Sequence, residues 1–159
     1  WFILVSKLAA GAAVSVAQVY AYLVIAYFWE IEPPTWWGDL TDLPALILVG
    51  LMLGALGMLL SSAIKQLENF AGVMNFVIFP MFFASSALYP LWRVRESSPI
   101  LYRICEANPF THAVELIRFS FYGKFDPLSF TVVLGCTVVF LGAAIIAYDP
   151  ARGLLSMRG

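Results

Sequence analysis

Four long apolar segments dominate the pattern of hydrophobic and polar positions along the chain. They cover about residues 8–29, 43–64, 69–92 and 127–148, and none has Asp, Glu, Lys or Arg in its interior. A helix of about 20 residues spans the ~30 Å hydrocarbon layer of a bilayer, and helices satisfy their own backbone polar groups in lipid. The pattern therefore predicts an all-α, polytopic integral membrane protein with four transmembrane helices. The alternative, buried helices of a large soluble protein, lacks the amphipathic helices that would wrap them.

The stretch between the third and fourth segments, about residues 93–126, has a helical pattern of its own. Asn108 suits an N-cap, Pro109 the first helical position and Gly123 a C-terminal stop. Apolar residues recur there at helical spacing: Phe110, Ala113, Val114, Ile117 and Phe121. We expect a short amphipathic helix that lies on the outer interface or dips into it as a re-entrant element. His112 lies on its polar side, where Glu115 and Arg118 can pair, and a further helix from about Ser98 to Cys105 fits the same stretch.

Charged residues near the ends of the segments predict the orientation in the membrane. Residues 1–7 form an apolar lead-in anchored by Lys7, whereas the loop 30–42 carries four acids and no Lys or Arg. The positive-inside rule places Lys7 and Lys65 in the cytoplasm, together with the tail that carries Arg152 and Arg158. The outer stretch holds five basic residues against these four, which by count alone favours the inverted topology. In the first hairpin, however, Lys7 and Lys65 lie at one end and no basic residue lies at the other. This asymmetry favours the orientation with Lys7 and Lys65 in the cytoplasm.

The composition excludes several classes of protein. The 159 residues are 62% hydrophobic and 12% charged, and the mean hydropathy is +0.87, whereas soluble domains carry about 25% charged residues. These values argue against a soluble domain and against disorder. Nine Lys and Arg against ten Asp and Glu form no basic stripe, so no nucleic-acid partner is expected.

The chain lacks the motifs of catalytic, cofactor and metal sites. It has no G-x-x-x-x-G-K-[ST] loop for nucleotide phosphates, one histidine, two cysteines and no Ser/His/Asp set within the spans. We therefore expect no catalytic residue, cofactor or metal site in this chain. The spans also lack the ionisable residues that proton-coupled carriers place at membrane depth. Energy for uphill transport would come from another subunit.

The third segment is rich in phenylalanine and carries two unusual residues at membrane depth. The candidates for a seam between subunits or a translocation path are Asn75, Phe76, Phe79, Pro80 and Phe83. Proline removes a backbone hydrogen bond and should bend the helix, and an amide at this depth needs a partner helix or a wet cavity. Plain core packing is the alternative explanation for the same residues. Gly50, Gly54 and Gly57 in the second segment indicate close helix packing within the chain.

Two motifs resemble the ABC-2 type transporter permeases. The first runs from Glu68-Asn69-Phe70 through Phe79-Pro80-Met81-Phe82-Phe83 to Tyr89-Pro90-Leu91. The second is Asn108-Pro109-Phe110-Thr111-His112-Ala113-Val114-Glu115-Leu116-Ile117-Arg118, similar to the family pattern N-P-[LF]-[TS]-x-A-V-[ED]-x-[IL]-R. The opening residues 1–8 resemble the entry to the family's third span, so the resemblance covers nearly the whole chain.

The resemblance implies a six-span permease fold of which residues 1–159 supply the C-terminal two-thirds. Two spans and the elements that dock an ATPase would lie upstream. Two permease subunits, as a homodimer, would pair in the bacterial inner membrane, each with a nucleotide-binding subunit that binds ATP and Mg. Residues 93–126 would form the extracytoplasmic cap, in which Asn108, Pro109, His112, Glu115 and Arg118 carry the motif. The family's substrates include drugs, lipid-linked glycans and polysaccharides, and no residue here chooses among them.

Two alternatives to an exporter subunit belong to other classes. A membrane-embedded enzyme acting on lipid head groups would have to use His112, Glu115 and Arg118 at the outer leaflet. A membrane scaffold without transport activity would bind partners only. Co-purification of an ATPase would separate the exporter subunit from both.

Overall fold

The computed structural model describes residues 2–29, 37–64 and 67–147, and every regular element in these ranges is a helix. The elements are α1 (Phe2–Phe28), α2 (Gly38–Thr41), α3 (Leu43–Ala63), α4 (Leu67–Phe83), α5 (Leu91–Ser97), α6 (Pro99–Ala107), α7 (Pro109–Phe121) and α8 (Pro127–Ala147). The predicted all-α membrane fold is confirmed.

Three of the described helices are long and apolar enough to cross a membrane: Val5–Phe28 in α1, Leu43–Ser62 in α3 and Pro127–Ala147 in α8. Helices α3 and α8 end within one residue of the predicted segments. Helix α1 begins at Phe2, so the predicted interfacial lead-in is instead part of the helix. The reason is local, because residues 2–7 contain neither Pro nor Gly to end a helix that already runs through Leu8.

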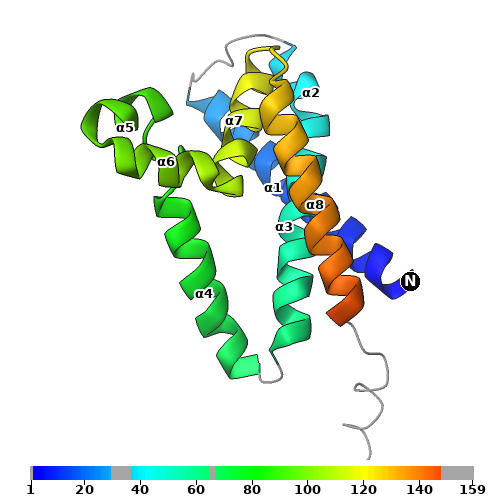
Figure 1. The fold of residues 1–159 in the computed structure, drawn as a ribbon. Coiled ribbons are helices and arrows are strands. Elements are labelled where there is room, and N and C mark those ends of the chain that lie inside the picture. The colour runs from blue at the N-terminus through cyan, green and yellow to red at the C-terminus, as the bar shows by residue number, and fades with distance from the viewer. Residues whose placement is uncertain (1, 30–36, 65–66, 148–159) are drawn as a thin grey trace, which may run out of the picture.

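Helix α3 is the centre of the bundle, with α1 packed on one side and α8 on another (Figure 1). At the crossing with α1, a Cβ added to Gly50 would lie 3.3 Å from the Cα of Ala12. A Cβ on Gly54 would lie 3.3 Å from Leu8 Cδ2. The prediction of close packing within the chain is therefore confirmed for Gly50 and Gly54, whose neighbours would have to shift to admit a Cβ, whereas an added Cβ at Gly57 meets nothing within 4 Å.

A second packing centre joins α3 to α7 and α8. Its buried residues are Ala45, Val49, Met52, Ala113, Leu116 and Val133. Because α7 contributes two of them, the outer motif is anchored directly on the spanning bundle.

Helix α4 stands apart from the other long helices and touches the bundle mainly near its connection to α3 (Figure 1). It ends at Phe83, nine residues before the predicted end of the third span at Trp92. Ser85 causes the early stop, because its hydroxyl donates to the carbonyl of Phe82 (2.6 Å) and accepts from the N–H of Ala87 (3.2 Å). The apolar run continues past this turn, which is why the sequence pattern alone overestimates the length.

Helices α5, α6 and α7 form the cap predicted for residues 93–126. The Ser98 hydroxyl accepts from Leu101 N–H at the start of α6, so the predicted helix from Ser98 is confirmed. Helices α5 and α6 lie across the end of α4, whereas α7 stands alongside the ends of α3 and α8 (Figure 1). Of the two expected positions, α7 therefore has the one that dips in alongside the spanning helices, and it does not lie flat across their ends. Ala113 and Leu116 are buried in the cluster shared with α3 and α8, and these contacts hold the helix upright against the bundle.

The cap lies at one end of the molecule, and the last turn of α3 and the first turn of α4 lie at the other (Figure 1). Five residues behind the orientation argument lie outside the described ranges: Glu30, Glu32, Lys65, Arg152 and Arg158. The orientation with the cap outside therefore stays a prediction from charge.

Candidate functional site at the outer end of α4

Asn108 ties the start of α7 to the end of α4. Its amide nitrogen donates to the carbonyl oxygens of Met81 (2.7 Å) and Ala84 (2.9 Å), while its side-chain oxygen accepts from Phe110 N–H (3.0 Å). The last carbonyls of a helix have no partner inside the helix, and in an apolar setting each costs free energy unless a donor reaches it. One side chain therefore caps two helices at once, the C-terminus of α4 and the N-terminus of α7. Pro109 follows in the first helical position, as predicted.

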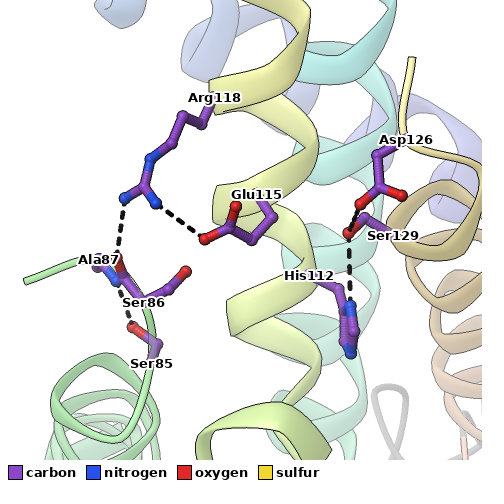
Figure 2. A network of polar contacts seen from close by, with 8 residues as sticks. All are labelled: Ser85, Ser86, Ala87, His112, Glu115, Arg118, Asp126 and Ser129. Atoms are coloured by element: carbon purple, nitrogen blue, oxygen red, sulfur yellow. Dashed lines mark hydrogen bonds and ion pairs between the residues drawn. The ribbon is translucent and has the colours of Figure 1, made fainter. Parts of the chain in front are cut away.

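Arg118 makes a second connection between the same two elements, three turns further along α7. Its guanidinium pairs with the Glu115 carboxylate (2.8 Å) and donates to the carbonyl of Ser86 (2.9 Å), as Figure 2 shows. The predicted Glu115–Arg118 pair is confirmed. A third contact is aromatic, since the Phe82 and Phe110 rings meet edge to face with centroids 6.2 Å apart. We call these contacts of Asn108, Phe110 and Arg118 with residues 81–86 the α4–α7 joint.

Replacing Arg118 by methionine should lower the free energy of unfolding by about 1–3 kcal/mol, because Glu115 loses its ion partner and the Ser86 carbonyl its donor. Arg118→Lys keeps the charge but not the planar guanidinium whose two nitrogens reach both acceptors. We therefore expect an intermediate loss of unfolding free energy. Arg103→Met is the control, since Arg103 is exposed and has no ion pair or hydrogen bond in the described chain. Thermal unfolding in detergent measures all three, and equal midpoints for the Arg118 and Arg103 variants would contradict this role of Arg118.

His112 links three helices on the other side of α7. Its Nε2 lies 2.9 Å from the carbonyl oxygen of Glu106 at the end of α6, and its Nδ1 lies 3.4 Å from Ser129 Oγ in α8. Because a carbonyl only accepts, Nε2 carries a proton. The Ser129 hydroxyl donates to the carboxylate of Asp126, which also accepts from Leu128 N–H at the start of α8. His112 therefore donates from Nε2 to α6, and its Nδ1 lies beside Ser129 of α8, so the ring does not point freely into water.

The residues that an enzyme at the outer leaflet would need do not gather. Figure 2 shows His112 directed toward Ser129 and Asp126, whereas Glu115 and Arg118 are directed toward Ser86 on another side of α7. Glu115 and Arg118 neutralise each other, and His112 Nε2 donates to a backbone carbonyl while Nδ1 lies beside Ser129. This arrangement suits connections between helices better than acid–base chemistry on a substrate.

The two cysteines are free thiols in the described structure. Cys105 in α6 is 2% exposed, and burial raises the pKa of its thiol. A thiol with a raised pKa is a poor nucleophile at neutral pH, so Cys105 acts as a small packing residue.

The five seam or path candidates share one exposed side of α4. Asn75, Phe76, Phe79, Pro80 and Phe83 are all exposed, with Phe76 at 80%. Phe79 and Phe83 stack with their ring centroids 6.2 Å apart. Intrachain core packing, the alternative explanation for this phenylalanine-rich segment, does not occur for these residues among the described helices. The structure thus places the five residues together on a side of α4 against which no other described helix packs.

Two features of the structure were missed from the sequence. The side-chain nitrogen of Asn108 donates to the carbonyl of Met81, which lies 27 residues earlier in the chain. An N-capping pattern in the sequence identifies only the side-chain oxygen, which accepts. Gln18 lies exposed in α1 at membrane depth. It was missed because the spans were searched for ionisable residues, and a search for any side chain with a strong hydrogen-bonding group would have found it.

Comparisons with known proteins agree with these motifs. The family described as ABC-2 type transporter matches residues 1–122. The chain is similar to "Nodulation protein J" of Neorhizobium galegae, at 29% identity over 115 residues, or 72% of this chain and 41% of the relative. It is also similar to "Nodulation protein J" of Rhizobium leguminosarum bv. viciae, at 29% identity over 90 residues, or 56% of this chain and 33% of the relative. No solved structure matches the chain.

The chain thus spans about two fifths or less of the length of these relatives. The family match covers α1 to α7, including the phenylalanine-rich helix and the whole α4–α7 joint. Together with the three long apolar helices, this match shows that the protein is a multi-pass membrane protein that belongs to the ABC-2 type transporter family.

Proposed function

We propose that residues 1–159 are the C-terminal two-thirds of a six-span permease subunit of an ATP-driven exporter in a bacterial inner membrane. A separate nucleotide-binding subunit binds ATP and Mg and supplies the energy, and the substrate belongs to the drug, lipid or glycan classes. The family match over residues 1–122 carries this proposal. It is supported by the absence of ionisable residues inside the apolar segments, which leaves an external energy source as the simplest explanation.

The α4–α7 joint suggests how movement passes through this subunit. Helix α4 has few contacts with the other spans, so it is free to tilt relative to the bundle formed by α1, α3 and α8. At its outer end, Asn108 and Arg118 hold α4 to α7, and α7 is packed on α3 and α8. A tilt of α4 driven from the cytoplasmic side would therefore pivot at this joint. The inner part of α4 would then move further than its outer end.

The exposed aromatic side of α4 is where we place a second permease subunit, with the substrate path beside it. Three phenylalanine rings that are more than half exposed offer a large contact surface, and Asn75 offers a hydrogen bond at membrane depth. In lipid alone, the Asn75 amide would have no hydrogen-bond partner. A facing helix or a water-filled path would supply one.

Replacing Phe79 and Phe83 together by alanine should weaken dimerisation about tenfold or more, since buried aromatic anchors at interfaces are worth about 1–2 kcal/mol or more. Subunit photobleaching in liposomes, at several ratios of protein to lipid, measures the dimer fraction. The control is Phe28→Ala, because Phe28 is 81% exposed at the end of α1 and lies on no proposed seam. A double variant that dimerises and transports like the wild type would remove both residues from the seam and the path.

Co-purification tests the proposed energy source. The full-length protein, tagged and extracted from its own host in mild detergent, should bring down a subunit with the phosphate-binding G-x-x-x-x-G-K-[ST] loop. The pulled-down assembly should hydrolyse ATP, and a substitution of that loop's lysine should abolish the hydrolysis. An intact assembly that transports without an ATP-binding subunit would contradict the proposal.

A further inference from the structure

Helix α1 packs against the rest of the described chain through one side only. Leu8 and Ala12 are buried against α3, at positions four residues apart. Most of the remaining circumference is exposed, and only 11% of the Val5–Phe28 span is buried, against 39% for the span in α3. Because α1 belongs to a membrane protein, its exposed sides face either lipid or other helices.

One exposed position on α1 does not suit lipid. Gln18 lies near the middle of the Val5–Phe28 span, and its side-chain amide has no hydrogen bond to any residue that the structure describes. An amide carries two donors and an acceptor, and hydrocarbon satisfies none of them. Transmembrane helices meet this demand by placing such residues at contacts with other helices, where a polar side chain faces them.

The neighbours of Gln18 favour a close helix contact on the same side. Gly11 and Ser15 lie seven and three residues before Gln18, and Tyr22 lies four residues after it. This spacing keeps all four on one side of the helix, and all four are exposed. The Ser15 hydroxyl already donates to the Gly11 carbonyl (3.0 Å), so the Gln18 amide, one turn before the exposed Tyr22, still needs a partner.

The other flank of α1 has a different character. Small apolar residues of α1, including Ala9, Ala13 and Ala17, line an open groove of about 580 Å³ with Leu43 and Ile47 of α3. No polar side chain lines it, so an acyl chain fits there without cost. The requirement for a polar partner is therefore confined to the side that carries Gln18.

We infer that the Gln18 side of α1 packs against a membrane-spanning helix of the upstream part of the same subunit, and that this helix brings an amide or hydroxyl side chain to the depth of Gln18. The inference rests on the six-span subunit proposed above. It is supported by the relatives, because the matched stretch covers only 41% and 33% of their length and most of their polypeptide lies outside it. We assign the second permease subunit to the aromatic side of α4 instead.

Photo-crosslinking in the full-length protein, in its own membrane, tests the inference. A small diazirine amino acid is placed at position 18, and in separate proteins at Ser15 and Tyr22, which bracket Gln18 and leave it intact. Position 24 is the reference, because Val24 is 56% exposed and turned away from the Gln18 side. Mass spectrometry then identifies what each diazirine has attached to.

We expect positions 15, 18 and 22 to label an upstream helix of the same subunit, next to an Asn, Gln, Ser or Thr, while position 24 labels mainly lipid. Gln18→Leu should lower the protein adduct at position 15 by about threefold, the factor that one hydrogen bond between helices in a membrane represents. Lipid adducts at all three positions, at the ratio seen at position 24, would overturn the inference. Adducts to α1 of a second copy, or to another protein, would overturn it as well.

The same preparations separate this inference from the proposed function. Lipid adducts at 15, 18 and 22 in an assembly that still holds an ATP-binding subunit overturn the inference alone. An upstream-helix adduct in an assembly that transports without such a subunit overturns the proposed function alone.

Discussion

Replacing Asn108 by alanine is expected to lower the free energy of unfolding by about 2–4 kcal/mol, the largest loss for any single side chain in the cap. The substitution removes the N-cap of α7 and, at the same time, the donors of the Met81 and Ala84 carbonyls. Loss of an N-cap costs about 0.5–2 kcal/mol and each hydrogen bond about 0.5–1.5 kcal/mol. The free energy of unfolding by denaturant, measured in a fixed detergent micelle, reports the difference.

Two further variants separate the parts of this effect. Ser98→Ala removes only an N-cap, that of α6, where the Ser98 hydroxyl accepts a single bond of 3.4 Å. It should cost at most about 1 kcal/mol. Asn108→Asp keeps the cap of α7 but sets a carboxylate against two carbonyl oxygens, so it should destabilise at least as much as alanine does. If Asn108→Ala cost no more than Ser98→Ala, the double capping by Asn108 would be wrong.

Replacing Gly50 by leucine is expected to push α1 away from α3. A Cβ at this position already lies 3.3 Å from Ala12 Cα and 3.7 Å from Ser15 Cβ, and leucine adds three more carbons. Overpacking of this kind costs about 1–3 kcal/mol, and here the close neighbour is backbone, which cannot rotate away. We expect a lower unfolding midpoint and faster proteolysis at the ends of α1.

Gly57→Leu is the matched control for this substitution. Gly57 lies two turns further along α3, and an added Cβ there meets nothing within 4 Å. Leucine also has the higher helix propensity, so this variant should be neutral or slightly stabilising. Similar losses for the two leucine variants would show that the effect comes from the bulk of leucine in α3 and not from the crossing with α1.

The apolar pattern was sufficient to predict the spanning helices, because a helix that crosses the lipid must be apolar over a length that matches the hydrocarbon layer. Residues 43–64 and 127–148 match α3 and α8 to within one residue. The end of α4 was not predictable in this way, since a serine turn ends the helix inside an apolar run. Hydropathy measures the environment of a segment, not its backbone hydrogen bonds.

The residues of the α4–α7 joint were predictable as a motif, but their partners were not. Asn108 and Arg118 stood out as a cap and as half of an ion pair, both of which are local interactions. Their bonds to the carbonyls of residues 81, 84 and 86 join segments 24 to 32 residues apart. Backbone carbonyls are the same at every residue and so leave no trace in the sequence. The choice between α7 lying on the interface and α7 dipping into it stayed open for a related reason, because a helix buried against other helices in lipid and one lying on the interface share the same apolar spacing.

The distance between spin labels placed just beyond the ends of α4 and α7 tests the central claim most directly. In the full-length assembly with Cys105 and Cys136 replaced by serine, labels are placed at Leu88 and Tyr122, which flank the α4–α7 joint and are 46% and 55% exposed. A second sample carries a label at Phe76 in each permease subunit. Both are measured without nucleotide and with ATP and vanadate trapped on the partner subunit.

The account predicts that the distance between the two Phe76 positions changes on trapping, whereas the Leu88–Tyr122 distance keeps the same distribution. A Leu88–Tyr122 distance that shifts beyond the spread of the labels, with no change between the Phe76 positions, would contradict it.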